Sequence, residues 1–199
     1  MMLIEETPVP EAALPLVQFK AHLRLGSGFG EDSLQDEVLQ SFLRAAIAAI
    51  EARTCKVLIT RDFSWSLLQW RDPALQVLPV APVVTVASIT MIDAVGGEQA
   101  LAVDQYRLEQ DAQYPRIRPV GAMLPTVVSG GSVKILMTAG MTADWDGLPA
   151  DLGQAVLLLA AHYYEYRDET TLGRGCMPFG VTSLIERYRV LRLAIGAVQ

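Results

Sequence analysis

The segment PADLGQAVLLLAAHYYEYR, residues 149–167, decides the fold. Its apolar side chains recur every three or four residues, as they do along one face of an α-helix. They are Leu152, Ala155, Val156, Leu159, Ala160 and Tyr163. The sequence therefore predicts a helix over 149–167 that packs through this face.

Two more helices are predicted near the start of the chain. Residues 14–25 repeat Leu16, Phe19 and Leu23 at helical spacing. Asp32 followed by Gln35 is typical of a helix start and predicts a helix over 33–54. That helix carries two neighbouring apolar stripes, namely Leu34, Val38, Phe42, Ala45 and Ala49, and beside them Leu39, Leu43, Ala46 and Ile50. So wide a face, rich in alanine, indicates packing on more than one side.

The middle of the chain, residues 58–138, changes from a helical period to alternation. Phe63, Trp65 and Leu67 alternate with polar residues, which indicates a half-buried strand. Further short strands are predicted at 83–92, 105–108, 116–118 and 133–138, with Pro and Gly residues between them. This pattern predicts a small antiparallel β unit.

The two ends are predicted to stand outside the main body. Residues 1–13 show no periodicity and are read as an arm, and residues 168–180 are read as a loop because of their Gly and Pro content. Ser183 and Glu186 form a capping box for a final helix, with a stripe of Leu184, Tyr188, Leu191 and Ile195. Because that stripe is separated from the body, we expect removal of the chain from Thr182 onward to leave a folded protein.

The predicted fold class is therefore α+β and mainly α. It is a helical bundle, with two N-terminal and two C-terminal helices, that carries a small antiparallel β insert. The predicted organisation is an arm at 1–13, one domain at 14–167, and an assembly segment at 168–199.

Composition narrows the classes of function. Of 199 residues 51% are hydrophobic and 19% charged, which favours an oligomer or a docked subunit. The net charge is −6, and the sixteen basic residues are scattered, which argues against a tight nucleic-acid binder. The longest apolar run is too short for a membrane helix, and residues 1–6 predict no secretory signal. Two cysteines without metal spacing favour a reducing, cytosolic origin.

Few residues offer catalytic chemistry. His162 and Glu165 lie one helical turn apart, but a metal site needs more ligands, and the only other histidine, His22, belongs to another predicted helix. Cys176 has no histidine nearby in the sequence. The sequence therefore predicts no enzyme, cofactor or metal. A small enzyme that uses His162 or Cys176 is the alternative.

Several motifs, taken in order, carry a family resemblance. They are Lys20-Ala21-His22-Leu23-Arg24, residues 43–51, residues 101–108, Thr138-Ala139-Gly140-Met141, and residues 148–167. The last contains the pattern P-x-D-L-x-Q-A-x-L-L-L-x-A-x-x-Y-E-x-R from Pro149 to Arg167. The chain resembles the head–tail connector, or adaptor, proteins of long-tailed phages and gene transfer agents, most closely the adaptor of a gene transfer agent. The Gly-rich turn at 26–30 departs from the more acidic turn of that family.

The resemblance implies a structural subunit of the neck of a virion-like particle, assembled in the host cytoplasm. Copies would form a dodecameric ring beneath the portal protein, bind a stopper or head–tail joining protein, and let DNA pass through the lumen without specific binding. It implies no membrane contact. The implied contacts with the portal or a neighbouring subunit are Leu184, Tyr188, Leu191, Ile195, Phe179, Met177 and Arg174. A DNA-packaging accessory protein is the second alternative.

Overall fold

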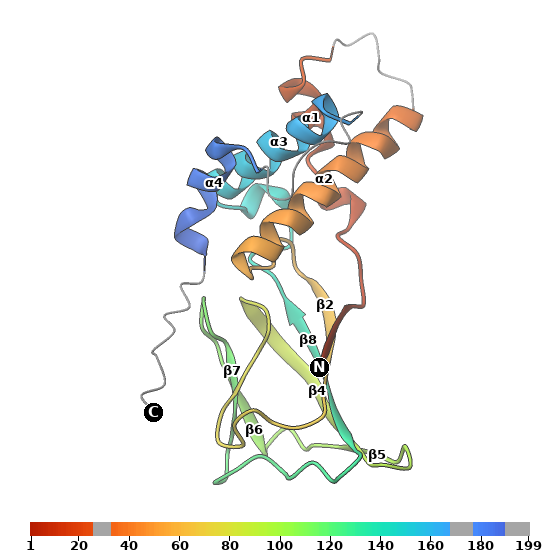
Figure 1. Cartoon of the computed structure of the whole chain (residues 1–199), viewed down its shortest axis with the longest axis vertical. Helices are drawn as coiled ribbons and strands as arrows, with labels where there is room; N and C mark the ends of the chain where they lie inside the picture. Colours follow the sequence, from red (N-terminus) through yellow and green to blue (C-terminus); the bar gives the residue numbers. More distant parts are fainter. Residues whose placement is uncertain (26–32, 168–176, 190–199) are drawn as a thin grey trace, which may run out of the picture.

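The helices gather at one end of an elongated molecule. The computed structural model describes residues 1–25, 33–167 and 177–189. Its helices are α1 (Leu16–His22), α2 (Ser33–Thr54), α3 (Ala150–Glu165) and α4 (Phe179–Ile185), with 3-10 turns η1 (Glu11–Ala13), η3 (Trp145–Gly147) and η4 (Glu186–Tyr188). They form the upper part of the view in Figure 1, and we call them the helical half. In the described part of the chain, no helix is long and apolar enough to span a membrane.

The strands form the other half, in two antiparallel sheets. The larger sheet has the order β1-β2-β8-β4-β5. Its strands are β1 (Met2–Glu5), β2 (Arg61–Leu67), β8 (Ser132–Ala139), β4 (Val83–Ile92) and β5 (Glu98–Ala100). The smaller sheet has the order β3-β7-β6, formed by β3 (Gln76–Val77), β7 (Arg116–Pro119) and β6 (Tyr106–Glu109). We call this part the β half (Figure 1).

The predicted fold class, a mainly α bundle with a small β insert, is wrong. The structure is an α+β fold with 35% helix and 27% strand, and its described residues contain eight strands. The physical reason is that the β half has a core of its own. Trp65, Ile89, Ile117, Ile135 and Met137 are buried together there, separate from the core between the helices.

The helical core confirms the helices predicted over 33–54 and 149–167. Leu39, Leu43 and Ile50 of α2 pack in one cluster with Leu152 and Leu159 of α3. Of the two stripes predicted on α2, only the second is wholly buried. The first is largely open, because Val38 and Ala45 are exposed and Phe42 and Ala49 are only partly buried.

Residues 1–13 belong to the fold and not to a separate arm. β1 pairs antiparallel with β2, in a register that sets Leu3 opposite Trp65 and Glu5 opposite Phe63. Val9 and Ala13 are buried in the helical core. No periodicity marks this segment, because the four residues of β1 are all exposed and only Val9 and Ala13 are buried after them.

The C-terminal helix begins earlier than predicted. α4 starts at Phe179 with Pro178 as its N-cap, so the capping box of Ser183 and Glu186 is wrong. Val181 and Ile185 are buried in the helical core. α4 is therefore part of the folded body, and its first turns are not an independent assembly element.

Gly140, in the Thr138-Ala139-Gly140-Met141 motif, lies where β8 leaves the larger sheet. Its φ is +154°, and a Cβ at this position would lie 2.2 Å from the Cα of Thr60. The Gly140 amide donates to the Pro82 carbonyl at 3.0 Å. Only glycine fits this close approach of two chain segments.

Candidate functional site: docking surfaces and the junction of the two halves

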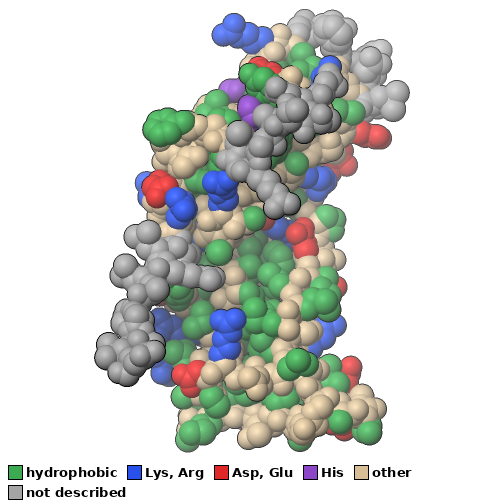
Figure 2. All heavy atoms as spheres, in the orientation of Figure 1, with side chains coloured by type: hydrophobic (Ala, Val, Ile, Leu, Met, Phe, Trp, Pro, Cys, Tyr) green, Lys and Arg blue, Asp and Glu red, His purple; other side chains and the backbone are tan. Residues whose placement is uncertain are grey.

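The two histidines, predicted on different helices, lie close together. His22 at the end of α1 and His162 on α3 line one pocket together with Glu165, Pro178 and Val181. Figure 2 shows both imidazoles side by side on the helical half.

This pocket does not have the donor set of a metal centre. Within residues 1–25, 33–167 and 177–189 no group of three or more His, Cys, Asp or Glu side chains could hold a metal ion. The His162 ring packs 4.6 Å from the ring of Tyr166 and 6.4 Å from that of Tyr163, measured between centroids. Cys176 lies outside the described residues. The arrangement fits a histidine packed among aromatic rings better than a catalytic one.

The predicted partner residues differ in what they can offer to another molecule. Phe179, at the start of α4, is 86% exposed. Met177, Leu184 and Tyr188 are partly buried and pack against the helical core. Arg174, Leu191 and Ile195 lie outside the described residues.

Tyr188 is held within the subunit. Its hydroxyl donates to Oδ1 of Asp151 at 2.8 Å, and Nε of Arg187 lies 2.8 Å from Oδ2 of the same carboxylate. Asp151 is the aspartate of the P-x-D-L pattern, so this motif residue fastens η4 to the first turn of α3. Burial raises the pKa of Tyr188, so its hydroxyl stays a donor at neutral pH. Phe179 is thus the described residue of the predicted set that is most open to a partner.

A buried arginine, which no sequence pattern marks, joins the helical half to the β half. Arg61, the first residue of β2, has a side chain only 5% exposed. Its Nη1 and Nη2 donate to Oε1 and Oε2 of Glu51 on α2, at 3.0 and 2.6 Å. Its Nε lies 2.9 Å from Oε1 of Glu5 on β1. We call these three residues the junction.

The junction also holds a backbone group. Oε1 of Glu51 also accepts from the Leu58 amide at 2.7 Å, at the point where the chain enters the β half. Burial lowers the pKa of Arg61, but its hydrogen bonds and charge interactions with Glu51 and Glu5 outweigh burial and raise the pKa above its ordinary value. The guanidinium is therefore charged at neutral pH. Of the three junction residues, Glu51 belongs to a family motif, as the last residue of 43–51. A charged residue at the end of that apolar stretch was the signal in the sequence.

A local basic cluster occurs on the smaller sheet, although basic residues are scattered along the sequence. Nε of Arg118 donates to Oε2 of Glu109 at 2.8 Å, and Arg107 lies 3.4 Å from Oε1. The hydrogen bond from Arg118 lowers the pKa of Glu109; burial opposes this effect, and the charges of the neighbouring arginines add to it. Glu109 thus offsets part of the positive charge.

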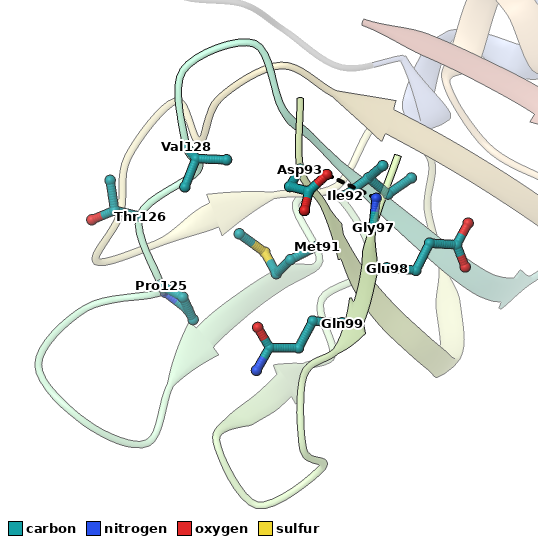
Figure 3. A pocket seen from close by; sticks show the side chains of 9 residues that line it. All are labelled: Met91, Ile92, Asp93, Gly97, Glu98, Gln99, Pro125, Thr126 and Val128. Atoms are coloured by element: carbon teal, nitrogen blue, oxygen red, sulfur yellow. Dashed lines mark hydrogen bonds between the residues drawn. The ribbon is translucent and has the colours of Figure 1, made fainter. Parts of the chain in front are cut away.

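A pocket near the far tip of the β half has two carboxylates in its lining. It lies between the β4–β5 hairpin and residues 125–128, with Met91 and Val128 among its walls (Figure 3). The carboxylate of Asp93 is used locally, because its Oδ1 accepts from the amides of Val95 and Gly97 at 2.9 and 2.8 Å. The only other charged side chain in the lining is Glu98.

The chain is similar along nearly its whole length to proteins of gene transfer agent particles. A chain from the neck of an empty particle, computed with C6 symmetry, is 51% identical with a TM-score of 0.88. A chain from the virion of a native particle is 52% identical with a TM-score of 0.85, and one from a native neck computed with C12 symmetry is 49% identical with a TM-score of 0.83. Each match covers 98% of this chain and 99% of the other.

No protein-family model and no curated protein matches the chain. The structural matches nonetheless extend over both halves and confirm the resemblance drawn from the motifs. Identity of about one residue in two over 98% of the chain, with TM-scores of 0.88 and 0.85, shows that the fold is shared. The chain therefore belongs to the head–tail connector proteins of gene transfer agents, and it is a structural component of the particle neck.

Proposed function

We propose that this chain forms a closed ring of twelve copies that joins the portal of a DNA-filled capsid to the next component of the neck. The observation that carries the proposal is the 51% identity, over 98% of the chain, with a chain of a particle neck. Neck structures of the relatives were computed with C6 and C12 symmetry, which supports a ring of identical subunits. Such a ring repeats one heterologous contact until it closes.

The helical half faces the portal in this proposal. Phe179 presents a large exposed aromatic surface, and aromatic residues of this kind often dominate the binding energy of an interface. Met177, Leu184 and Tyr188, on the same C-terminal segment, are partly exposed. Arg174, Leu191 and Ile195, outside the described residues, stay predicted portal contacts. The tip of the β half would face the stopper, because Val95, Val120 and Met123 are exposed there.

DNA passes through the ring without specific binding. The net charge of −6 supports this, because binding to the phosphate backbone needs clustered cations that are not neutralised by acidic neighbours. The arginines of the smaller sheet are partly offset by Glu109.

Phe179→Asp tests the portal contact. We expect a folded protein that no longer attaches to filled heads, with tailed particles reduced roughly tenfold or more, because an aromatic anchor of an interface contributes about 2 kcal/mol or more. Electron microscopy and gene-transfer counts measure the loss. The matched control is Val17→Asp on α1, which is also highly exposed on the helical half and should leave particles unchanged. Normal tailed particles from Phe179→Asp would contradict this contact, and tailed particles from a strain that lacks the protein would contradict the whole proposal.

The protein has no enzymatic or metal-dependent activity in this proposal. We expect His162→Gln and His22→Gln to leave both metal content and particle yield unchanged, because their pocket lacks a third ligand of suitable geometry among the described residues. Elemental analysis of the purified protein measures the metal content, and particle counts measure the yield. Stoichiometric zinc or iron that disappears in His162→Gln would overturn this reading.

A further inference from the structure

The N-terminal strand has an unpartnered edge and exposed apolar side chains. β1 lies at one end of the larger sheet and pairs only with β2 among the described residues. Its residues Met2, Leu3 and Ile4 are all exposed, as is Met1 before them. Natural proteins usually protect such an edge with charges, proline or a covering element, whereas β1 places three apolar residues, Met2, Leu3 and Ile4, before its one charged residue, Glu5.

The backbone groups of Leu3 and Glu5 point away from the sheet. The amide of Glu6 donates to the carbonyl of Asp62 at 2.9 Å, which marks Glu6 as a residue bonded to β2. Hydrogen-bonded and non-bonded residues alternate along an antiparallel pair, so Ile4 and Met2 also bond to β2. Leu3 and Glu5 therefore present their N–H and C=O groups at the open edge.

A groove between two other open strand edges lies on the opposite side of the β half. β5 pairs only with Thr90–Ile92, so residues 83–88 of β4 have no strand on that side in the described chain. β6 is likewise the outer strand of the smaller sheet. The groove between them is lined by the apolar side chains of Val84, Val86, Val103, Tyr106 and Leu108, together with Thr85 and Gln110. The Gln110 amide donates to the Val84 carbonyl at 3.0 Å, so a strand that enters the groove would displace this side chain. In Figure 1, β1 and the pair β6–β7 lie on opposite sides of β4.

The open edge of β1 and the groove beside β4 lie at the same level along the strands of the larger sheet. The register sets Glu5 opposite Phe63, Phe63 opposite Met137, and Met137 opposite Val86. One row of residues thus runs from β1 to the part of β4 that lines the groove. A neighbour related by rotation about an axis parallel to the strands would bring its β1 to the level of this groove.

We propose that β1 of each subunit seats in the groove between β4 and β6 of the next copy of this chain. This proposal rests on the proposed ring. The outward N–H and C=O groups of Leu3 and Glu5 would extend the ladder of the neighbour, and Leu3 would enter between its two sheets beside Val103 and Leu108. Since the strand and the groove are different surfaces on opposite sides of one chain, the contact is heterologous and closes by rotation into a ring.

Cross-linking of assembled particles tests the contact. In a background of Cys55→Ser and Cys176→Ser, the pair Leu3→Cys and Val103→Cys is treated with a short bis-maleimide. We expect a ladder of dimers, trimers and larger multimers on a denaturing gel. Every subunit can be linked through Leu3→Cys to one neighbour and through Val103→Cys to the other. The control pair Leu3→Cys and Val17→Cys has the same number of thiols, and Val17 is as exposed as Val103, at 78% against 77%. It should give no ladder.

A second pair of variants separates the contact from folding. Leu3→Asp and Val103→Asp should each keep the thermal midpoint of the monomer yet reduce the protein recovered on purified heads roughly tenfold, the effect of about 1.4 kcal/mol. Val17→Asp should not reduce it. If particles contain the protein and carry tails but show no ladder and no effect of Val103→Asp, the strand contact is wrong while the proposed ring stands. If unmodified protein is absent from purified particles, the proposed function itself fails.

Discussion

Arg61→Met is expected to destabilise the protein by about 3–5 kcal/mol, the usual cost of leaving a buried charge without its partner. The carboxylate of Glu51 is only 11% exposed and receives two hydrogen bonds from Arg61. Without them it keeps only the amide of Leu58. Urea unfolding followed by circular dichroism measures the loss.

Two controls separate charge from packing at the junction. Adding Glu51→Gln to Arg61→Met should restore much of the stability, because a neutral amide still accepts from Leu58 and no longer needs a cation. Arg107→Met removes an arginine from the exposed pair with Glu109 and should cost less than about 1 kcal/mol. An Arg61→Met variant as stable as Arg107→Met would show that the junction does not hold the two halves together.

Removal of residues 182–199 is expected to unfold the helical half, the reverse of what the sequence pattern indicated. The deletion takes away Ile185, which is 1% exposed, and the bond from Tyr188 to Asp151. Truncation of one such buried aliphatic side chain to alanine costs about 2–5 kcal/mol, a large share of the 5–15 kcal/mol typical of a whole domain. Thermal unfolding and far-ultraviolet circular dichroism of the truncated protein measure the effect.

Point variants locate the cause. Ile185→Ala should lower the free energy of unfolding by about 2–5 kcal/mol, and Leu184→Ala, at a partly buried neighbour, by clearly less. A chain that ends after Arg189 keeps α4, η4 and the bond to Asp151, and should stay folded. A fully folded protein without residues 182–199 would return α4 to the role of a separate assembly element.

The elements that the sequence predicted well are long and strongly periodic. α2 has the predicted bounds, and α3 buries the predicted face except for Tyr163, which is partly exposed. β3 and β5 are two and three residues long, too short to show alternation. β1 shows none because all four of its residues are exposed. The size of the β half was therefore underestimated.

The candidate site was predicted less completely, because its geometry depends on contacts between distant residues. Arg61 reads as the polar start of a strand, and its partners Glu51 and Glu5 are 10 and 56 residues away. The exposure of Phe179 follows from how α4 packs on α3, which its own spacing does not reveal. Tyr188 fits an apolar stripe but is bound to Asp151. The motifs gave the family correctly, since they need only local order along the chain.

The central place of β8 in the larger sheet bears on how the nascent chain matures. β8 separates β2 from β4, yet it is the last strand of the sheet to be synthesised. While the ribosome is still making residues 93–131, β2 and β4 have no β8 to pair with, and α2 has no α3 to pack against. Pairings this distant slow folding and leave apolar strand edges open in the meantime. The protein should therefore reach its native state only after nearly the whole chain has emerged, and chaperones would be most valuable to it in that interval.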